Sequence, residues 1–427
     1  MTDLTPAPIA ELDAARAALP RRVAMLSMHT SPLAVLGGRE TGGMNVYVRE
    51  VAVALGTLGV AVDVFTRRMD PALPEVQEMG ANARLVQVEA GPVALIEKEE
   101  MPALTSAFAV GVDAFRAQQG IAYDLVHSHY WLSVEAGDQL AVQWDVPHVA
   151  MFHTLGEVKL RARASEHETP ERIEAERRLV HRLDRIVAAT EHERQLLRQI
   201  YRVPPQNVAV IPLGVNLSQF QPTDRAEARD RAGLPRDERI ILTIGRLEPL
   251  KGFDILIRSL AAMSNRRGVG LYIIGGDERA NAERARLDAI ARDSGVADAV
   301  HFLGSRPHEA LPDYYNAADV VAVPSFYESF GLVAVEAMAC GVPVVASRVG
   351  GLASTVVDGR TGHLIAWRCP EPFAEKIELL LANEELRRAM GASARQRMES
   401  YAWDQVAARV ATLYADLIAE HARATAS

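Results

Sequence analysis

Short apolar runs alternate with amphipathic helical stretches from one end of this 427-residue sequence to the other. The strand-like runs cover residues 22–28, 62–66, 83–88, 124–129, 148–152, 185–190 and 207–213 in the first half, and 239–245, 271–276, 300–304, 319–325 and 342–347 in the second. Strands that alternate with helices are typical of parallel sheets with helices on both faces. The sequence therefore predicts an α/β fold with two Rossmann-like, doubly wound domains that face each other across a cleft.

A polar segment, residues 216–238, separates the two halves and contains Pro222 and Pro235. This composition is typical of a linker, and 427 residues are more than one ordinary core covers. We expect an N-terminal extension at 1–20, a first domain at 21–215, this linker, a second domain at 239–400 and an amphipathic C-terminal helix at 401–427.

Composition argues against several classes of partner. The net charge of −9 disfavours nucleic acid, and no apolar run reaches the roughly 18 residues that a membrane span needs. Cys340 and Cys369 lack metal-ligand spacing, which favours a reduced, cytoplasmic location. The sequence leaves the oligomeric state open, a homodimer included.

A βαβ unit with a glycine-bearing turn covers residues 324–345. Its turn follows the carboxyl end of the strand at 319–325, where open α/β sheets place their ligands. The unpaired N–H groups at the start of its helix suit an anion; they are those of Phe330, Gly331 and Leu332. Glu328 and Glu336 flank these groups as hydrogen-bond acceptors, so a ligand with both phosphate and hydroxyls, such as a nucleotide-sugar, fits the pattern.

Two further loops at strand ends are candidates for ligand contact. Gly42 and Gly43 precede a helix expected to begin near Met44, so the backbone can approach a ligand closely there. Arg246 and Lys251 follow the first strand of the second half, and two cations stabilise the charge that grows on a leaving diphosphate. The same residues also fit a plain tight turn and two solvated surface cations, and the sequence leaves these alternatives open.

Cofactor motifs are missing from the sequence. No G-x-G-x-x-G follows the first strand of either half, which disfavours a nicotinamide or flavin. There is no Asp-x-Asp motif and no His or Cys cluster, so no metal or other cofactor is required, although a divalent cation is not excluded. His153 and Thr154 follow the strand at 148–152, and a lone histidine in such a place is more often structural than catalytic.

The chain resembles family 4 of the retaining glycosyltransferases, which have the GT-B fold, in five motifs that occur in the same order. These are GGMNVYVRE, HSHYWLS, FHTLG, GRLEPLKG and SFYESFGLVAVEAMACGVPVV. The resemblance runs from about Arg22 to the C-terminus. It is strongest to the inositol-phosphate N-acetylglucosaminyltransferases of mycothiol synthesis, through MLSMHTSPL, TGGMNVYV and DLVHSHYWLS, and it extends to sucrose-phosphate synthases through ERIEAERR at 171–178.

The resemblance implies a role for each motif. The residues implied in catalysis are His153, which would contact the donor sugar, Arg246 and Lys251, which would bind the diphosphate, and Glu328, which would bind a sugar hydroxyl. The residues implied in donor binding are Gly42, Gly43, Arg306 beside the base, Phe330, Gly331, Leu332, and Glu336 on the ribose hydroxyls. The residues implied in acceptor binding are His29, Asn45, Lys98, Tyr130, Thr154 and Arg172.

The implied acceptor residues have a pattern of their own. Lys98 and Arg172 are two cations far apart in sequence, joined by the hydroxyls of Tyr130 and Thr154. Such a group suits a phosphate monoester, which offers acceptor oxygens in several directions. Lys98 lies in a mixed-charge run, so plain solvation of this side chain is the alternative.

We therefore expect a retaining hexosyltransferase whose co-substrate is a nucleoside diphosphate sugar, UDP-linked by resemblance, with glucose and N-acetylglucosamine both open. The expected acceptor is a hydroxyl of a phosphorylated polyol or sugar, with inositol phosphate favoured over the fructose 6-phosphate of sucrose-phosphate synthases. An inactive sugar-nucleotide-binding module is the alternative from another class, which the presence of Lys251, Glu328 and Glu336 disfavours. A glycogen-phosphorylase-like enzyme would need a pyridoxal lysine site, for which the sequence gives no sign.

Overall fold

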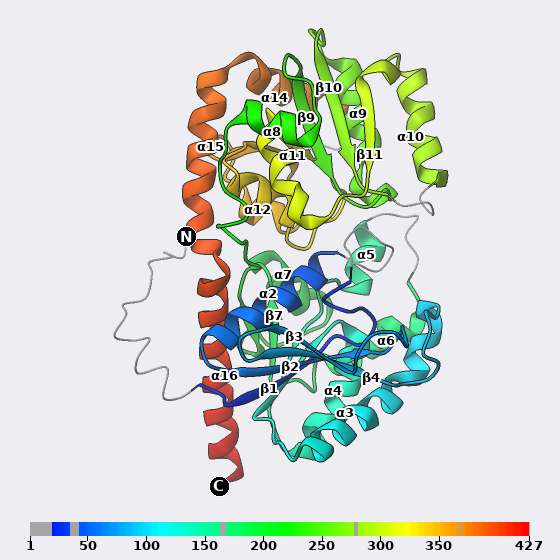
Figure 1. The fold of residues 1–427 in the computed structure, drawn as a ribbon, viewed down its shortest axis with the longest axis vertical. Coiled ribbons are helices and arrows are strands. Elements are labelled where there is room, and N and C mark those ends of the chain that lie inside the picture. The colour runs from blue at the N-terminus through cyan, green and yellow to red at the C-terminus, as the bar shows by residue number, and fades with distance from the viewer. Residues whose placement is uncertain (1–18, 35–41, 163–167, 277–280, 367–368, 427) are drawn as a thin grey trace. The chain divides into compact units, whose positions relative to one another are not determined.

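The computed structural model describes residues 19–34, 42–162, 168–276, 281–366 and 369–426. Most of the expected N-terminal extension and Thr41 of the first glycine motif lie outside the described residues. The chain divides after Gly214 into two compact units (Figure 1). The described residues up to Ala34, Gly43–Gly214 and the segment from Trp403 onward form the first unit, and Val215–Ala402 lies in the second.

The first unit contains an eight-stranded sheet among its described residues, in the order β3-β4-β2-β1-β5-β6-β7-β8. The strands are β1 (Arg22–Leu26), β2 (Ala61–Arg67), β3 (Val76–Gly80), β4 (Ala83–Val88), β5 (Leu125–His129), β6 (His148–Met151), β7 (Arg185–Ala188) and β8 (Val208–Val210). All neighbours pair in parallel except β3, which is antiparallel to β4 and was not predicted. The chain order reverses between β1 and β5, so their carboxyl ends form the sheet edge at which this topology usually places ligands.

Helices connect the strands of the first unit. They are α2 (Gly43–Thr57), α3 (Thr105–Gln119), α4 (Trp131–Trp144), α5 (Gly156–Ala162), α6 (Pro170–Leu179) and α7 (Glu191–Ile200), with short 3-10 turns η1 (Lys98–Leu104) and η2 (Pro205–Asn207). The helix expected at the C-terminal end of the sequence is α16 (Trp403–Thr425), which packs against α2. It buries Val406, Val410 and Tyr414, and the ring of Trp403 lies 5.8 Å from that of Tyr47.

The second unit contains a six-stranded, fully parallel sheet in its described part, in the order β11-β10-β9-β12-β13-β14. The strands are β9 (Arg239–Ile244), β10 (Val269–Ile274), β11 (Val300–Gly304), β12 (Val320–Val323), β13 (Val344–Ser347) and β14 (Gly362–Ile365). β14 was not predicted, and β10 begins two residues earlier than the run expected at 271–276. The order reverses between β9 and β12, which makes this a doubly wound sheet, as expected.

The helices of the second unit are α8 (Arg225–Ala232), α9 (Phe253–Ala262), α10 (Asn281–Asp293), α11 (Leu311–Ala317), α12 (Leu332–Ala339), α13 (Leu352–Thr355), α14 (Pro370–Ala382) and α15 (Glu384–Met398). Short 3-10 turns are η3 (Pro249–Lys251), η5 (Ala297–Ala299), η6 (His308–Ala310) and η7 (Glu399–Tyr401). The helix expected to begin near Gly331 is therefore α12.

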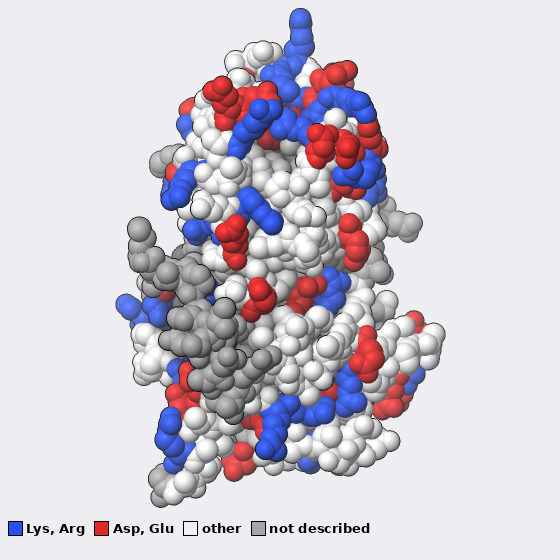
Figure 2. All heavy atoms as spheres, turned by 60° about the vertical axis from the view of Figure 1, so that its left-hand side comes forward, with Lys and Arg blue, Asp and Glu red and all other residues white. Residues whose placement is uncertain are grey.

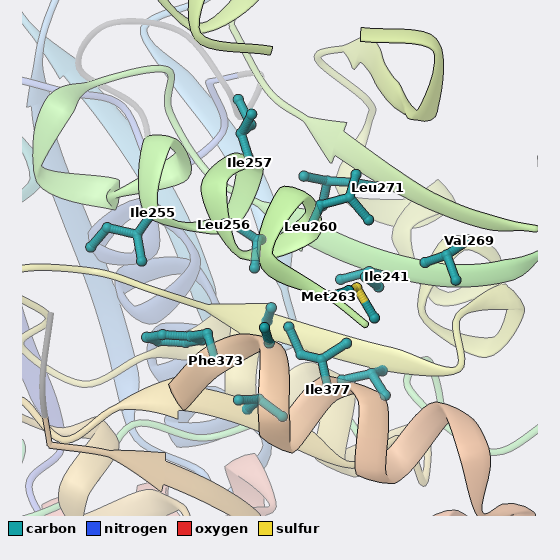
Figure 3. Close-up of a cluster of buried hydrophobic side chains, with 14 of the residues drawn as sticks. Ile241, Ile255, Leu256, Ile257, Leu260, Met263, Val269, Leu271, Phe373 and Ile377 are labelled. Atoms are coloured by element: carbon teal, nitrogen blue, oxygen red, sulfur yellow. The ribbon is translucent and has the colours of Figure 1, made fainter. Parts of the chain in front are cut away.

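An apolar core fixes the sheet of the second unit against α9 and α14. Figure 3 shows Leu256 of α9 and Ile377 of α14 pointing into the space between the two helices. Ile241 and Leu271 complete the core from β9 and β10. Burying each such side chain stabilises the fold by about 1.5–3 kcal/mol, so the loops at the strand ends are held by a rigid base.

The segment expected to be a linker contains α8, which is tied to the sheet of the second unit. Asp319, just before β12, is 4% exposed and pairs with Arg225 and Arg229 of α8 at 2.9 Å each. Its carboxylate also accepts a hydrogen bond from the N–H of Ile240. This buried ion cluster fastens α8 to the amino ends of β9 and β12.

The surface of the molecule carries charges of both signs. Basic and acidic side chains are interspersed on the face shown in Figure 2. Among the described residues, no helix has both the length and the apolar character needed to cross a bilayer.

Candidate active site

The loop after β12 carries Glu328 and leads into α12. Gly331 at the helix start has φ of 94°, a left-handed value that favours glycine. A Cβ here would lie 2.6 Å from Cδ2 of Leu352. Within the described part of the chain, the N–H groups of Phe330, Gly331 and Leu332 have no hydrogen-bond acceptor. The helix start with unpaired N–H groups expected from the sequence is therefore present in the backbone, and its binding of an anion stays a prediction.

A second glycine turn, Gly350–Gly351, packs closely against the backbone of this loop. This contact was not predicted from the sequence. A Cβ on Gly350, whose φ is 46°, would lie 1.9 Å from the carbonyl oxygen of Glu328. A Cβ on Gly351 would lie 2.3 Å from Cα of Phe330, and the Gly351 N–H donates to the Glu328 carbonyl at 2.9 Å. The glycine pair after the strand at 342–347 is the signal that could have predicted this contact between backbones.

Lys251 and Glu328 form an ion pair, Nζ to Oε2, at 2.8 Å. Both side chains are mostly buried, with 21% and 16% exposed. Lys251 comes from η3 after β9, and its stem runs along Gly245, where a Cβ would lie 3.5 Å from the Lys251 Cδ. Arg246, from the same loop, is half exposed and pairs with Glu248 at 3.0 Å. The structure thus brings Lys251, but not Arg246, against Glu328.

Glu336 is buried on α12 and is held by two partners that the sequence did not predict. Its Oε1 lies 2.7 Å from Nε2 of His308, and its Oε2 accepts from the hydroxyl of Tyr315 at 2.7 Å. Burial and the Glu336 charge raise the pKa of Tyr315 well above its ordinary value, so Tyr315 stays a donor. Because each carboxylate oxygen has two lone pairs, capacity remains for ligand hydroxyls. Arg306 donates from Nε to the hydroxyl of Tyr314 at 2.8 Å, away from this group.

In the first unit, two cations meet at one aromatic ring. The ammonium of Lys98 and the guanidinium of Arg172 each lie 4.9 Å from the centre of the Tyr130 ring. Cations are attracted to ring faces at such distances. Tyr130 precedes α4 with φ of 72°, and its hydroxyl is buried with no partner in the described structure. Three of the acceptor residues implied by the resemblance, Lys98, Tyr130 and Arg172, therefore converge.

Arg172 is almost completely buried, and all three nitrogens of its guanidinium donate hydrogen bonds. Its Nε donates to Glu176 at 2.7 Å and its Nη1 to Glu168 at 2.9 Å. Its Nη2 donates to the Thr154 carbonyl at 2.8 Å and to Thr154 Oγ1 at 3.1 Å. This network fixes the loop after β6 to α6, so Arg172 also has a structural role.

His29 and Asn45 lie at the loop after β1. The His29 ring is 4.4 Å from that of Tyr130, and the His29 Nδ1 is buried with no hydrogen-bond partner in the described part of the chain. Burial, Lys98, His153 and Arg172 all lower the pKa of His29 well below its ordinary value, so the local field is positive. Asn45 of α2 donates to Thr30 Oγ1 and to the Ser31 carbonyl, both at 2.7 Å. Gly43 begins α2, and a Cβ on Gly42 would meet no atom within 4 Å.

His153 follows β6 with φ of 60°, a strained value for a residue other than glycine. Its Nε2 lies 3.1 Å from Nδ1 of His129, and the Tyr47 ring packs edge-on against it at 5.4 Å. Burial lowers the pKa of His153 to about 3, so its imidazole is neutral at physiological pH. The sequence analysis did not single out His129. The alternation in HSH, which puts His127 and His129 on one face of β5, is the signal that could have done so.

The candidate residues thus fall into two groups, each within one unit. The first unit gathers His29, Lys98, Tyr130, His153, Thr154 and Arg172 at the ends of β1, β5 and β6. The second gathers Lys251 and Glu328 at the start of α12, with Arg246, Arg306 and Glu336 bonded to other partners. Among the residues that the structure describes, no group of three or more His, Cys, Asp or Glu could hold a metal ion.

Both halves of the chain match known protein families. Residues 224–397 match the family described as glycosyl transferases group 1, and residues 41–219 match glycosyltransferase family 4. The D-inositol 3-phosphate glycosyltransferase of Streptomyces bingchenggensis is 41% identical over 415 residues, which cover 95% of this chain and 91% of that protein. The chain belongs to the glycosyltransferases. A protein of the same name from Corynebacterium glutamicum is 39% identical to this glycosyltransferase over 407 residues, covering 93% of this chain and 97% of that protein.

Solved structures agree with this family. The sucrose-phosphate synthase of Thermosynechococcus elongatus superposes on the glycosyltransferase with a TM-score of 0.86 and 36% identity, covering 94% of this chain and all of that one. An Anabaena protein solved with UDP and glucose gives a TM-score of 0.75 at 19% identity, with 93% and 100% of the two chains covered, and this second likeness concerns the fold alone. The GT-B fold and the family predicted from the motifs are confirmed.

Proposed function

We propose that this glycosyltransferase moves a hexosyl group from a UDP-linked sugar to a hydroxyl of a phosphorylated polyol, with inositol phosphate as the favoured acceptor, and that the anomeric configuration is retained. The enzyme works in the cytoplasm and needs no resident metal or other cofactor.

The observation that carries the proposal is the pair of cations at Tyr130. Lys98 and Arg172 approach one ring, and the Tyr130 hydroxyl and the His29 Nδ1 are buried without hydrogen-bond partners among the described residues. A phosphate monoester carries acceptor oxygens in several directions and up to two negative charges, which suits this combination of positive field and unused hydrogen-bonding atoms. An acceptor without phosphate would have no use for it.

The names of the relatives support a phosphorylated acceptor in two forms. Proteins about 40% identical over nearly the whole chain are named for inositol 3-phosphate, which favours that acceptor. The sucrose-phosphate synthase of similar fold favours a second candidate, transfer to fructose 6-phosphate, which makes the same demand for a phosphate site. Glucose and N-acetylglucosamine are both candidates for the transferred group.

Retention is what the resemblance to family 4 of the retaining glycosyltransferases implies. A retaining glycosidase places a nucleophilic carboxylate about 5 Å from an acid, whereas Glu328 is engaged with Lys251 and Glu336 with His308 and Tyr315. Following that resemblance, we assign attack to the acceptor hydroxyl on the face from which the diphosphate leaves, with the diphosphate taking the proton. Lys251 and Arg246 stabilise the leaving charge, Glu328 and His153 hold the sugar, and the protein contributes positioning and electrostatics.

The test is release of nucleoside diphosphate by the purified full chain. UDP-glucose, UDP-N-acetylglucosamine, ADP-glucose and GDP-mannose would each be combined with inositol 1-phosphate, inositol 3-phosphate, inositol, fructose 6-phosphate and fructose. We expect release with a UDP sugar and a phosphorylated acceptor, unchanged by a chelator, and proton NMR of the product should show the donor's anomeric configuration.

Each other outcome has a distinct meaning. Equal release with the unphosphorylated acceptors would contradict the phosphate site. An inverted product would contradict the mechanism. Donor binding without any transfer would favour the inactive binding module.

A further inference from the structure

Three histidines form a row at the ends of two neighbouring strands, and the proposed function uses only one of them. His127 and His129 lie two residues apart on β5 and so share a face, while His153 follows the adjacent β6. The ring centres of His127 and His129 are 4.3 Å apart, and those of His129 and His153 are 5.2 Å apart. At the far end, Nδ1 of His127 lies 2.6 Å from the Tyr414 hydroxyl on α16.

Each ring in the row is neutral at physiological pH. Burial lowers the pKa of His127 and of His153 to about 3 and that of His129 well below its ordinary value. A neutral imidazole carries one proton, on Nδ1 or on Nε2. In the 3.1 Å contact between His129 Nδ1 and His153 Nε2, only one of the two atoms can be the donor.

The burial of His129 decides which atom donates. Its other nitrogen, Nε2, is enclosed and has no partner in the described structure. A proton on Nε2 would be an orphaned buried N–H, which proteins rarely tolerate. A proton on Nδ1 is shared with His153 instead, and leaves only an unused lone pair on Nε2. His153 Nε2 is then the acceptor, so the proton of His153 must sit on its Nδ1. Unlike Nε2 of His129, this Nδ1 is not a buried atom without a partner in the described structure, so it can carry the proton.

We propose that His129 is a positioning residue, which holds His153 in the tautomer with the proton on Nδ1. His153 then offers an N–H donor to an oxygen of its ligand and cannot act there as a base. The edge-on ring of Tyr47, 5.6 Å from His129 and 5.4 Å from His153, keeps the two imidazoles in place. The assignment of this ligand oxygen to the donor sugar rests on the proposed function. The assignment of the His153 tautomer does not rest on it.

The direct test is nitrogen NMR of the full chain labelled with ¹⁵N-histidine, in which the two tautomers give different shift patterns. The His153 signals are assigned by their loss in His153→Gln. We expect Nδ1 of His153 to be protonated in the wild type, and a mixture of tautomers in His129→Leu. Protonation at Nε2 of His153 in the wild type would overturn the proposal, whether or not the protein transfers sugar.

Kinetic measurements on two variants of His129 separate the effect of its hydrogen bond from the effect of its packing. The amide of His129→Asn can donate from the place of Nδ1, whereas His129→Leu fills space without a donor. By analogy with the hydrogen-bond partners of metal-ligating histidines, whose loss costs about 10- to 100-fold, we expect His129→Leu to lower kcat about tenfold or more and His129→Asn to recover most of that loss. His127→Leu, which removes the neighbouring ring but no bond to His153, should leave the His153 tautomer unchanged. Equal losses in the Leu and Asn variants of His129, with equal thermal stability, would reduce His129 to a packing residue.

Discussion

At the scale of single residues, the ion pair of Lys251 and Glu328 gives the sharpest prediction. Lys251→Ala removes the cation that we propose acts on the leaving diphosphate, and by analogy with a lost oxyanion donor this costs roughly 2.7–4 kcal/mol, or about 10²–10³ in kcat. Turnover is measured with the active pair of substrates, and the melting temperature checks that the fold is intact.

The matched control for this variant is Lys376→Ala. Lys376 lies on α14, pairs among the described residues with its neighbour Glu375 and is partly exposed, so its loss should leave turnover unchanged. Wild-type turnover in Lys251→Ala would remove this residue from the catalytic group.

The two cations at Tyr130 are not equivalent as probes of the acceptor site. Lys98→Ala should raise KM for the phosphorylated acceptor about 10- to 100-fold, because a hydrogen bond to a charged group contributes about 1.5–3 kcal/mol. KM for the donor should stay constant. A parallel rise in both constants, or in neither, would argue against a phosphate at Lys98.

Arg172→Ala is the poorer test. It would leave Glu176, which is fully buried, without its cation, and such a loss costs about 3–5 kcal/mol of folding free energy. A fall in activity would then report on stability as much as on binding. Arg172→Lys is not a remedy either, because one ammonium cannot reach Glu168, Glu176 and Thr154 together.

Part of this site was predictable from the sequence, for a physical reason. His29, Tyr130 and Thr154 follow β1, β5 and β6, which are neighbours in the sheet, and parallel strands bring their carboxyl ends to one edge. The partners of Glu336 were not predictable. His308 and Tyr315 reach it from η6 and α11 through tertiary packing, and no spacing in the sequence marks that choice.

At the scale of elements, the turn of Gly350 and Gly351 packs against the Glu328 loop. Adding one methyl group to this turn tests whether it positions the loop. In Gly350→Ala the Cβ would strike the Glu328 carbonyl, and it would be strained by the positive φ as well. We expect a loss of about 1–3 kcal/mol in stability and weaker UDP binding, measured by thermal unfolding and calorimetry.

Gly359→Ala is the control for backbone strain alone. Gly359 has φ of 75°, but a Cβ there would meet no atom within 4 Å. This variant should lose only about 1–2 kcal/mol and keep its UDP affinity. If both variants bind UDP as the wild type does, the turn does not position the loop.

Most strands were predicted because a buried parallel strand is apolar throughout, as in β10 and β12. The two that were missed are edge strands. β3, with the sequence VQEMG, is largely polar and partly exposed, and its pairing with β4 alone makes it a strand. β14 has only four residues, GHLI, too few for a pattern to stand out from a turn.

At the scale of the whole molecule, the buried histidines predict sensitivity to acid. Burial lowers the pKa of His127 and His153 to about 3 and that of His148 to about 4, from an ordinary value of 6.5. Below pH 6.5 the unfolded chain takes up protons that the folded chain does not, so stability falls as pH falls towards the folded pKa values. Each group contributes up to about 1.4 kcal/mol per pH unit.

One buried acid opposes this trend. Burial raises the pKa of Glu193 from 4.5 to about 7, so in that range the folded state holds a proton that the unfolded state releases, and acid stabilises it. Three histidines outweigh one glutamate, and the melting temperature should fall between about pH 6.5 and about pH 5. Glu193→Gln should steepen the fall. A melting temperature that rises on acidification would show that the histidines are not buried as neutral groups.

Helix α16 belongs to the first unit although it is translated after the second unit. Apart from Gly42, the described residues of the second unit all lie between Val215 and Ala402, whereas the first unit is completed by α16, Trp403–Thr425. A nascent chain therefore emerges with the face of α2 uncovered while the whole second unit is being synthesised. The half that is translated first completes its folding last, and during that interval it presents an apolar surface to chaperones and to other nascent chains.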